Sequence, residues 1–287
     1  MNAFKIDNLR TPFIESPFYK KLRENYSEHE YIEFADMLND CGYCIVDTDL
    51  SEPVINQANL EISNLIENGN FKKNSEAYHY NDSPRIVEGW KTCKSIKEIA
   101  VSKKINEILS FCYQSKAIPF STINFLKGTE QPLHSDEFHF GSIPHKYLAG
   151  CWIALEDIDP DSGPLAVAVG SQRLPIFSFE MLGLPVPKSE KEIKNFYTIY
   201  EDWVREMILA NNIKVVTPKL KKGQCLIWSS NVLHGSYEIK NKNLSRRSLV
   251  VHFHFEACEK IFYPSHSNLE QGKFVQRSLE NLDIRKQ

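Results

Sequence analysis

Apolar residues follow a helical period in the first part of the chain. They recur at helical spacing in three segments, at residues 30–41, 51–67 and 95–112. Gly42 follows the first segment and is a residue type that often ends helices. Ser51 and Pro53 open the second segment as an N-cap residue and a first-turn proline. The pattern therefore predicts helices here, with one short strand that begins at Tyr43.

From residue 119 the pattern changes to short β-favouring runs separated by Gly, Pro, Asn and Asp. The runs lie at residues 120–125, 148–155, 164–169, 224–229 and 249–255. Such spacing is typical of a β-sandwich or a β-barrel. Residues 188–212 return to a helical pattern, and strands resume directly afterwards. We therefore expect a helical insertion inside a β-domain.

These patterns predict one domain over residues 1–287, mainly β with flanking helices. Residues 1–118 supply helical and strand support, and residues 119–256 form the β core with the insertion at about 188–212. Residues 257–287 are a polar C-terminal extension for which no element is predicted. A chain of this length commonly forms one domain when it is rich in β-structure.

Composition and charge exclude several classes of protein. The chain has 34 Lys and Arg against 37 Asp and Glu, a net charge of −3, which offers no field for nucleic acid. Hydrophobic residues make up 42% of the chain, so general disorder is excluded. No run of eighteen apolar residues and no apolar N-terminal signal segment is present. We expect a cytoplasmic protein with no membrane span, and the sequence indicates no oligomeric state.

The seven cysteines are an odd number in a chain without an export signal, which favours reduced thiols. Cys41 and Cys44 form a C-x-x-C pair, but no second pair follows at zinc spacing. Residues 42–46 also have the pattern of a strand. Coincidence is the favoured interpretation, and a metal or redox pair is the alternative.

His134 and Asp136 are the first candidates for chemistry. In an extended backbone, residues two apart point to the same side, so this imidazole and carboxylate converge. His234, where a β-run ends in a turn, can complete a facial set of two imidazoles and one carboxylate. Such a set leaves three adjacent sites open and suits Fe(II) better than zinc. The alternative is that an isolated H-x-D occurs by chance and binds nothing.

A strand of alternating character starts at Arg246. One face carries an arginine, a serine and two histidines, and the other is largely apolar. The polar face comprises Arg246, Ser248, Val250, His252 and His254, and the opposite face comprises Arg247, Leu249, Val251, Phe253 and Phe255. A polar face of this kind is expected to line a pocket.

The ordered set of motifs resembles the phytanoyl-CoA dioxygenase family, which includes ectoine hydroxylase. The motifs are H-x-D, W-x-A-L, D-x-D-S-G-P-L, G-S-x-R, H-G-S and an arginine that opens a strand. The resemblance covers about residues 119–256, with a weaker match at 42–47. It implies an Fe(II)- and 2-oxoglutarate-dependent oxygenase on a double-stranded β-helix, which is a cupin-like jelly roll. Iron, 2-oxoglutarate and O2 would be the cofactors, and a small molecule the substrate.

By motif, the resemblance assigns iron to His134, Asp136 and His234. It assigns the distal carboxylate of 2-oxoglutarate to Arg246, whose planar fork makes two parallel bonds to a carboxylate. Contacts in the cosubstrate pocket are implied for three further residues, which are Ser236, Trp152 and, as a weaker match, Asn124.

Two features depart from the family's pattern. The interval between His134 and His234 is longer than usual because of the helical insertion. The arginine also lies one residue further from His234 than in some members, which leaves Arg247 as a rival to Arg246. Strand parity favours Arg246, because Arg247 shares its face with apolar residues.

The residues around the site leave the reaction and substrate open. A carboxylate at Asp136 favours hydroxylation over halogenation, with desaturation or ring closure as alternatives. Tyr78, His79, Tyr80 and Arg85 are candidates for a substrate-facing flap, and the insertion is either a lid or ordinary packing. Two other classes of protein are alternatives to the oxygenase. One is a cupin-type metal enzyme that does not use 2-oxoglutarate, and the other is a non-catalytic β-barrel that binds a small molecule.

Overall fold

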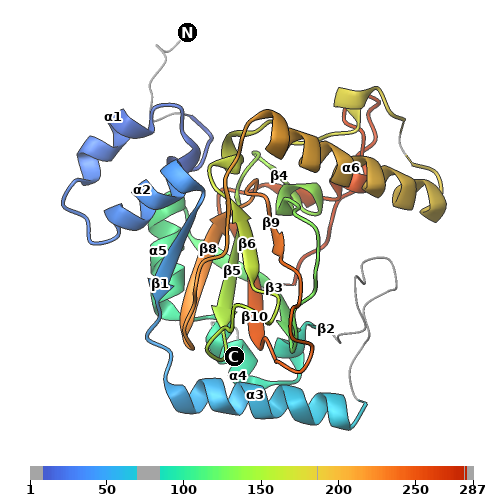
Figure 1. Ribbon diagram of the computed structural model, residues 1–287. Coiled ribbons are helices and arrows are strands. Elements are labelled where there is room, and N and C mark those ends of the chain that lie inside the picture. Colours follow the sequence, from blue (N-terminus) through green and yellow to red (C-terminus); the bar gives the residue numbers. More distant parts are fainter. Residues whose placement is uncertain (1–8, 70–84, 186, 281, 283–287) are drawn as a thin grey trace.

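The centre of the molecule is a large antiparallel sheet (Figure 1). The computed structural model describes residues 9–69, 85–185, 187–280 and 282. Within these residues, six strands pair in the order β1-β8-β5-β10-β3-β2. Their bounds are β1 Tyr43–Asp47, β8 Gln224–Ser229, β5 Leu148–Ala154, β10 Ser248–Phe255, β3 Ala117–Phe125 and β2 Arg85–Val87. Strands far apart in the sequence are therefore neighbours in space.

Smaller antiparallel sheets accompany the large one in the described chain. One has the order β7-β6-β9, with β7 Val215–Val216, β6 Leu165–Ala168 and β9 His234–Ser236, and another pairs β11 (Lys260–Phe262) with β4 (Gly141–Ile143). Leu165 and Val167 of β6 pack against the inner face of the large sheet, in one buried cluster with Trp152 of β5 and Val250 of β10. Two sheets thus enclose one apolar core, which is the arrangement of a β-sandwich.

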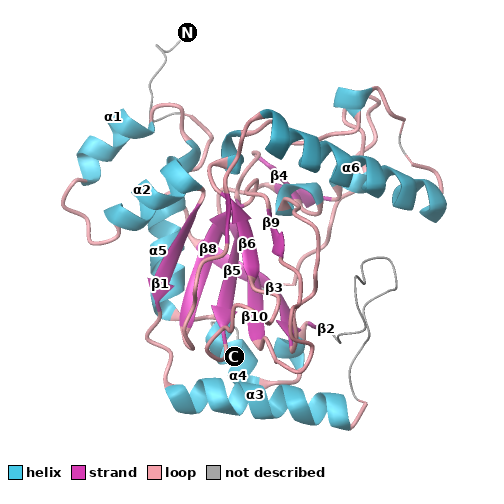
Figure 2. Cartoon of the chain, viewed as in Figure 1, coloured by secondary structure: helices cyan, strands magenta, loops and turns pink. Residues whose placement is uncertain are grey.

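Helices flank the large sheet on its other face (Figure 2). They are α1 Tyr19–Arg23, α2 Ile32–Cys41, α3 Glu52–Glu67, α4 Lys94–Ala100 and α5 Lys103–Tyr113. Their apolar faces join Leu249, Val251 and Phe253 of β10 in the largest buried cluster. Gly42 ends α2 with a left-handed φ of 81°. The prediction of a mainly β fold with flanking helices is confirmed.

The helix predicted over residues 95–112 is wrong in one respect, because the chain forms two helices there. Ser102 lies between α4 and α5 in a non-helical conformation, with φ −44° and ψ 127°. The break lets each helix turn its own apolar side, Ile96 and Ile99 in α4 and Ile105 and Ile108 in α5, into the same core. Helical periodicity runs through the break because both segments bury isoleucines at helical spacing.

The seven cysteines are free thiols. Cys44 lies in the core between the sheet and the helices, whereas Cys41 is partly exposed at the end of α2. Burial raises the pKa of Cys44 well above its ordinary value, so the group stays a thiol. The two cysteines therefore form no common site. Along the described residues, no helix combines the length and apolar character that crossing a bilayer requires.

The C-terminal segment is built into the fold, although its sequence predicted no element. β11 pairs with β4, and the chain then returns alongside β11. Tyr263 N donates to Val275 O at 2.9 Å, and Arg277 N donates to Ile261 O at 2.8 Å. Because β4 follows directly on the H-x-D segment, residues 260–277 are held next to that segment.

Candidate metal centre

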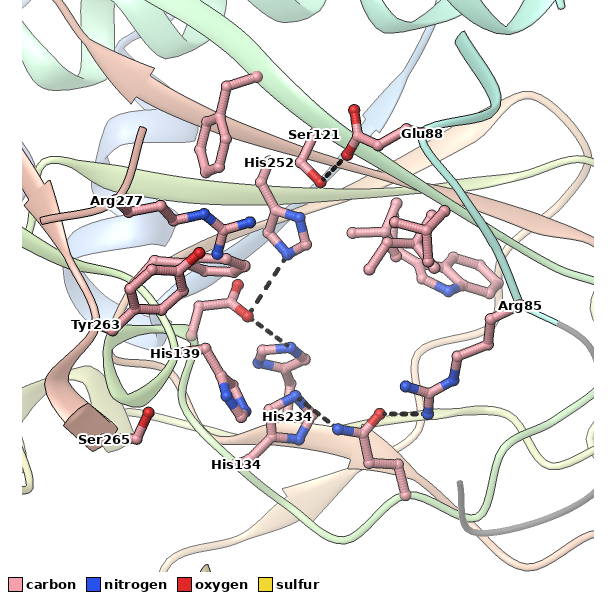
Figure 3. Close-up of a pocket in the computed structure, with 18 of the residues that line it drawn as sticks. Arg85, Glu88, Ser121, His134, His139, His234, His252, Tyr263, Ser265 and Arg277 are labelled. Carbon is pink, nitrogen blue, oxygen red and sulfur yellow. Dashed lines mark hydrogen bonds and ion pairs between the residues drawn. The ribbon is translucent and has the colours of Figure 1, made fainter. Parts of the chain in front are cut away.

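A cavity of about 1040 Å³ opens on the inner face of the large sheet. Its walls combine apolar residues of the core, such as Trp152 and Val250, with histidines and arginines (Figure 3). Both halves of the predicted site reach it, because His134 and Asp136 line it together with His234 and Arg246. Of the polar face predicted for β10, Arg246, Val250 and His252 line this cavity.

His134, Asp136 and His234 come together at one end of this cavity. One ligand atom from each can be chosen so that all three lie within 4.8 Å of one another, and they are the one group of this kind in the described chain. The backbones of His134 and His234 bond to each other in both directions at 2.9 Å. This bridge brings two segments a hundred positions apart to the same point. All three side chains are buried.

The two imidazoles are oriented by the backbone. His134 Nδ1 lies 3.0 Å from Pro132 O, and His234 Nδ1 lies 3.1 Å from Val232 O. A carbonyl oxygen can only accept, so each Nδ1 donates and Nε2 is left with its lone pair. Burial lowers the pKa of both histidines, which favours the neutral form that binds metals. Gln131 Nε2 contacts His134 Nε2 at 3.2 Å, a place that a metal ion would take.

Asp136 is held by a residue that the sequence did not indicate. Trp228 Nε1 donates to Asp136 Oδ2 at 2.7 Å. Oδ1 faces the histidines, 3.8 Å from His234 Nε2 and 3.6 Å from His252 Nε2. Burial by itself would raise the pKa of Asp136, but His234 and His252 outweigh it, so the pKa falls well below its usual range. The carboxylate is therefore ionised and has one oxygen free for a metal.

Gly150 explains how the Trp228 ring reaches the carboxylate. The two residues are opposite each other on β5 and β8. A Cβ on Gly150 would lie only 2.3 Å from the indole ring, so any other residue would displace the ring. The sequence signal was a glycine in the interior of a strand, which often marks a close approach.

We expect Trp228→Phe to weaken metal binding without unfolding the protein. Phenylalanine keeps most of the packing but removes the N–H that holds Asp136 Oδ2. Losing a partner of this kind typically costs about 10–100-fold in metal affinity. Anaerobic titration with Fe(II) measures the effect, and the melting temperature without metal serves as the control. Unchanged affinity in a folded variant would show that the indole does not position Asp136.

Helix α6 (Glu190–Ala210) supports the H-x-D segment from outside. Tyr200 is fully buried, and its hydroxyl accepts a hydrogen bond from Ser135 N at 2.6 Å. Its ring stacks on Phe138 with centroids 3.9 Å apart. Ile193 and Lys194, near the start of α6, also border the cavity. The insertion therefore both packs against the site segment and contributes to the cavity wall.

Arg246 lies in the cavity wall as a buried cation. Its side chain is 3% exposed, and Nη1 donates to Gly163 O at 3.0 Å and to Ser236 Oγ at 3.2 Å. Nε has no partner, and no carboxylate among the described residues pairs with the guanidinium. Burial, together with the charge of Arg85, lowers the pKa of Arg246 to about 10. A buried cation without a counter-ion is costly, so the site favours an anionic ligand.

Arg247 points the other way, toward α3. Its Nη1 donates to Ser63 Oγ at 3.0 Å and to Asn59 O at 3.3 Å. Trp152 is on the cavity side, where its ring lies 5.6 Å from Cζ of Arg246. Of the two arginines, only Arg246 therefore faces the cavity.

Asn124 does not reach the cavity, and the predicted contact with the cosubstrate is corrected accordingly. The neighbouring residues Ile123 and Phe125 line the cavity, so Asn124 projects from the opposite face of β3. Its Oδ1 lies 3.0 Å from the place where a Cβ on Gly89 would be, on the side of the helices. Strand parity carries the signal, because Asn124 alternates along the strand with Ile123 and Phe125.

The suggested flap lies mostly outside the described residues, which do not include Tyr78, His79 and Tyr80. Arg85 is described, and it borders the cavity next to Gln131, whose Oε1 accepts from Arg85 Nη2 at 3.0 Å. His252 also lines the cavity, beside Asp136.

Solved structures share this architecture. The epimerase SnoN from nogalamycin biosynthesis, described as non-heme and alpha-ketoglutarate dependent, is 15% identical, with a TM-score of 0.61 over 88% of this chain and 98% of that chain. The carbocyclase SnoK from the same biosynthesis is 14% identical, with a TM-score of 0.64 over 91% and 96%. EctD from S. alaskensis, solved with 2-oxoglutarate and 5-hydroxyectoine, is 17% identical, with a TM-score of 0.61 over 85% and 83%. At these identities the likeness concerns the fold, which is the predicted cupin-like jelly roll.

No curated protein sequence matches the chain significantly. The family model for phytanoyl-CoA dioxygenase (PhyH) matches residues 42–248. This interval begins at Gly42, ends at the start of β10, and contains the H-x-D motif, His234 and Arg246. The chain therefore belongs to the phytanoyl-CoA dioxygenase family.

Proposed function

We propose that this protein is a non-haem Fe(II)- and 2-oxoglutarate-dependent dioxygenase that hydroxylates a small-molecule metabolite. The observation that carries the proposal is the pairing of the three-ligand cluster with the buried, unneutralised Arg246 in one cavity. When bound, iron and 2-oxoglutarate supply the activation of O2, with release of succinate and CO2.

The residues present fit both groups. His134 Nε2, His234 Nε2 and Asp136 Oδ1 form the facial set of two imidazoles and one carboxylate that suits Fe(II) with open sites. Arg246 would hold the distal carboxylate of 2-oxoglutarate, with Ser236 Oγ fixing the guanidinium. Trp152 would form the wall of the cosubstrate pocket.

Two alternatives account for less of the site. A cupin enzyme that does not use 2-oxoglutarate has no need of a buried, unpaired arginine beside the metal cluster. A non-catalytic binding protein has no need of two imidazoles and a carboxylate that are each oriented by hydrogen bonds at 2.7–3.1 Å. The oxygenase uses both features.

The reaction type is proposed as hydroxylation because Asp136 occupies the third ligand position. The structural relatives include an epimerase and a carbocyclase, so the fold supports several outcomes of hydrogen abstraction. Product mass separates three groups of reactions, since hydroxylation adds one oxygen atom, desaturation and ring closure each remove two hydrogens, and epimerisation leaves the mass unchanged.

The function is tested with the full chain, Fe(II) and 2-oxoglutarate. Without O2, the two additions should together produce a visible charge-transfer band. With O2, succinate should form and should increase when a substrate is found in a panel of metabolites. Omitting iron or 2-oxoglutarate is the control. The proposal fails if neither the band nor iron-dependent succinate is observed.

A further inference from the structure

The cavity has a second cationic side, which is formed by Arg277. Figure 3 shows the Arg277 guanidinium beside His252 and Tyr263, and Arg85 on a different side of the cavity. This wall consists of residues from the C-terminal segment, among them Tyr263, Ser265 and Arg277. The family match ends at residue 248, so the wall belongs to a part of the chain outside it.

Arg277 is held in place by its backbone and by aromatic rings. Its N–H bonds to β11 through Ile261 O at 2.8 Å. Its Cζ lies 4.2 Å from the centroid of the Phe140 ring and 5.2 Å from that of Tyr263. Phe140 follows the H-x-D turn directly, which ties the position of Arg277 to that of the metal ligands. The side chain is thus held next to the proposed metal site.

The rings leave the donors of Arg277 available. Ring contacts cover the faces of a guanidinium, whereas its N–H groups lie in the plane and need acceptors. Within the described chain, the Arg277 side chain makes no hydrogen bond or ion pair. Glu88 lines the same cavity, but its oxygens accept hydrogen bonds from Ser121 Oγ and Trp90 Nε1. Arg277 therefore forms no direct ion pair with a carboxylate of the described residues.

Burial also lowers the pKa of Arg277, although Tyr263 and Glu88 act in the opposite direction. A partly desolvated cation is stabilised by an anion that enters the cavity. Arg246, on the side proposed for 2-oxoglutarate, is likewise a buried cation that an anionic ligand would stabilise. One dianion such as 2-oxoglutarate would satisfy the side of Arg246 and leave Arg277 for another ligand.

We propose that Arg277 binds an anionic oxyacid group of the substrate, either a carboxylate or a phosphate. Both groups accept two parallel charge-assisted bonds from the in-plane donors of a guanidinium. The hydroxyl groups of Tyr263 and Ser265 lie on the same wall and can add hydrogen bonds. The inference rests on the proposed function, because that function places 2-oxoglutarate at Arg246. The C-terminal segment would then select the substrate.

The test measures anion binding rather than turnover. The full chain is loaded with Mn(II) and one equivalent of 2-oxoglutarate without O2, and it is titrated calorimetrically with benzoate, phenyl phosphate and neutral benzamide. At least one anion should bind more tightly than benzamide. Arg277→Gln should lower the affinity for that anion at least tenfold and leave benzamide unchanged. Arg277→Lys, which keeps the charge but not the fork, should have a smaller effect. The preferred anion identifies the group.

Arg205→Gln on the exposed side of α6 is the matched control and should not alter anion binding. Circular dichroism and melting temperature verify that the variants fold, and Arg277→Lys keeps the test available if Arg277→Gln does not. Anion binding that is absent from the wild type, or equal in the folded Arg277 variants, overturns the proposal. So does binding that depends on Arg246 alone. Failure of 2-oxoglutarate to bind would instead remove the proposed function, while anion binding that depends on Arg277 would stand.

Discussion

Replacing His134 by alanine is expected to abolish tight iron binding and, with it, all formation of succinate. His134 supplies one of three clustered ligand atoms, and its Nε2 is left free by the bond of Nδ1 to Pro132 O. Loss of a partner that merely orients a ligand costs about 10–100-fold in metal affinity, so loss of the ligand itself should exceed 100-fold. Anaerobic equilibrium dialysis with Fe(II) measures the stoichiometry directly.

His29→Ala is the matched control for this variant. His29 is exposed and stacks on Phe111, on the side of the N-terminal helices. The His29→Ala variant is expected to bind one iron per chain, as is the wild type. Full iron stoichiometry in a folded His134→Ala protein would contradict the three-ligand assignment, whatever happens to activity.

The second large effect is expected for Arg246→Gln, which should weaken 2-oxoglutarate binding while iron binding is kept. A charge-assisted hydrogen-bond pair is worth about 1.5–3 kcal/mol, which corresponds to roughly a 10–100-fold loss of affinity. The free protein should not be strongly destabilised, because the variant removes a buried charge that pairs with no carboxylate in the described part of the chain. Anaerobic titration of the charge-transfer band measures the affinity.

Arg247→Gln tests the same change one residue away. Arg247 bonds to α3 through Ser63 and Asn59, so its loss should lower the melting temperature slightly and leave 2-oxoglutarate affinity unchanged. The assignment of Arg246 fails if the two variants lose affinity equally, or if only Arg247→Gln does.

Much of the fold was predictable because its signals are local. Short β-favouring runs bounded by turn residues marked β3, β5, β6, β8 and β10, and Gly42 marked the end of α2. The family resemblance, which the PhyH match confirms, rests on short motifs of the same local kind. The break at Ser102 was missed because periodicity does not register a turn between two helices that share one core.

Contacts between segments that are distant in the sequence could not be predicted from such local patterns. The bond from Trp228 to Asp136 joins β8 to the H-x-D turn, which lies 92 positions earlier in the sequence. Tyr200 supports Ser135 from a helix that the pattern showed merely as an insertion. Arg277 lies in a polar tail without periodicity, and its place in the cavity depends on pairing with β11.

The sequence by itself determined the kinds of ligand, their order along the chain and the faces of the strands that carry them, since side-chain direction alternates along extended backbone. The tertiary structure alone decided which polar groups share the cavity. It turned Arg246 inward, left Asn124 on the helical side and brought Arg277 into the wall of the same cavity. These outcomes depend on how strands far apart in sequence pair, because pairing, unlike alternation, is a property of the whole fold.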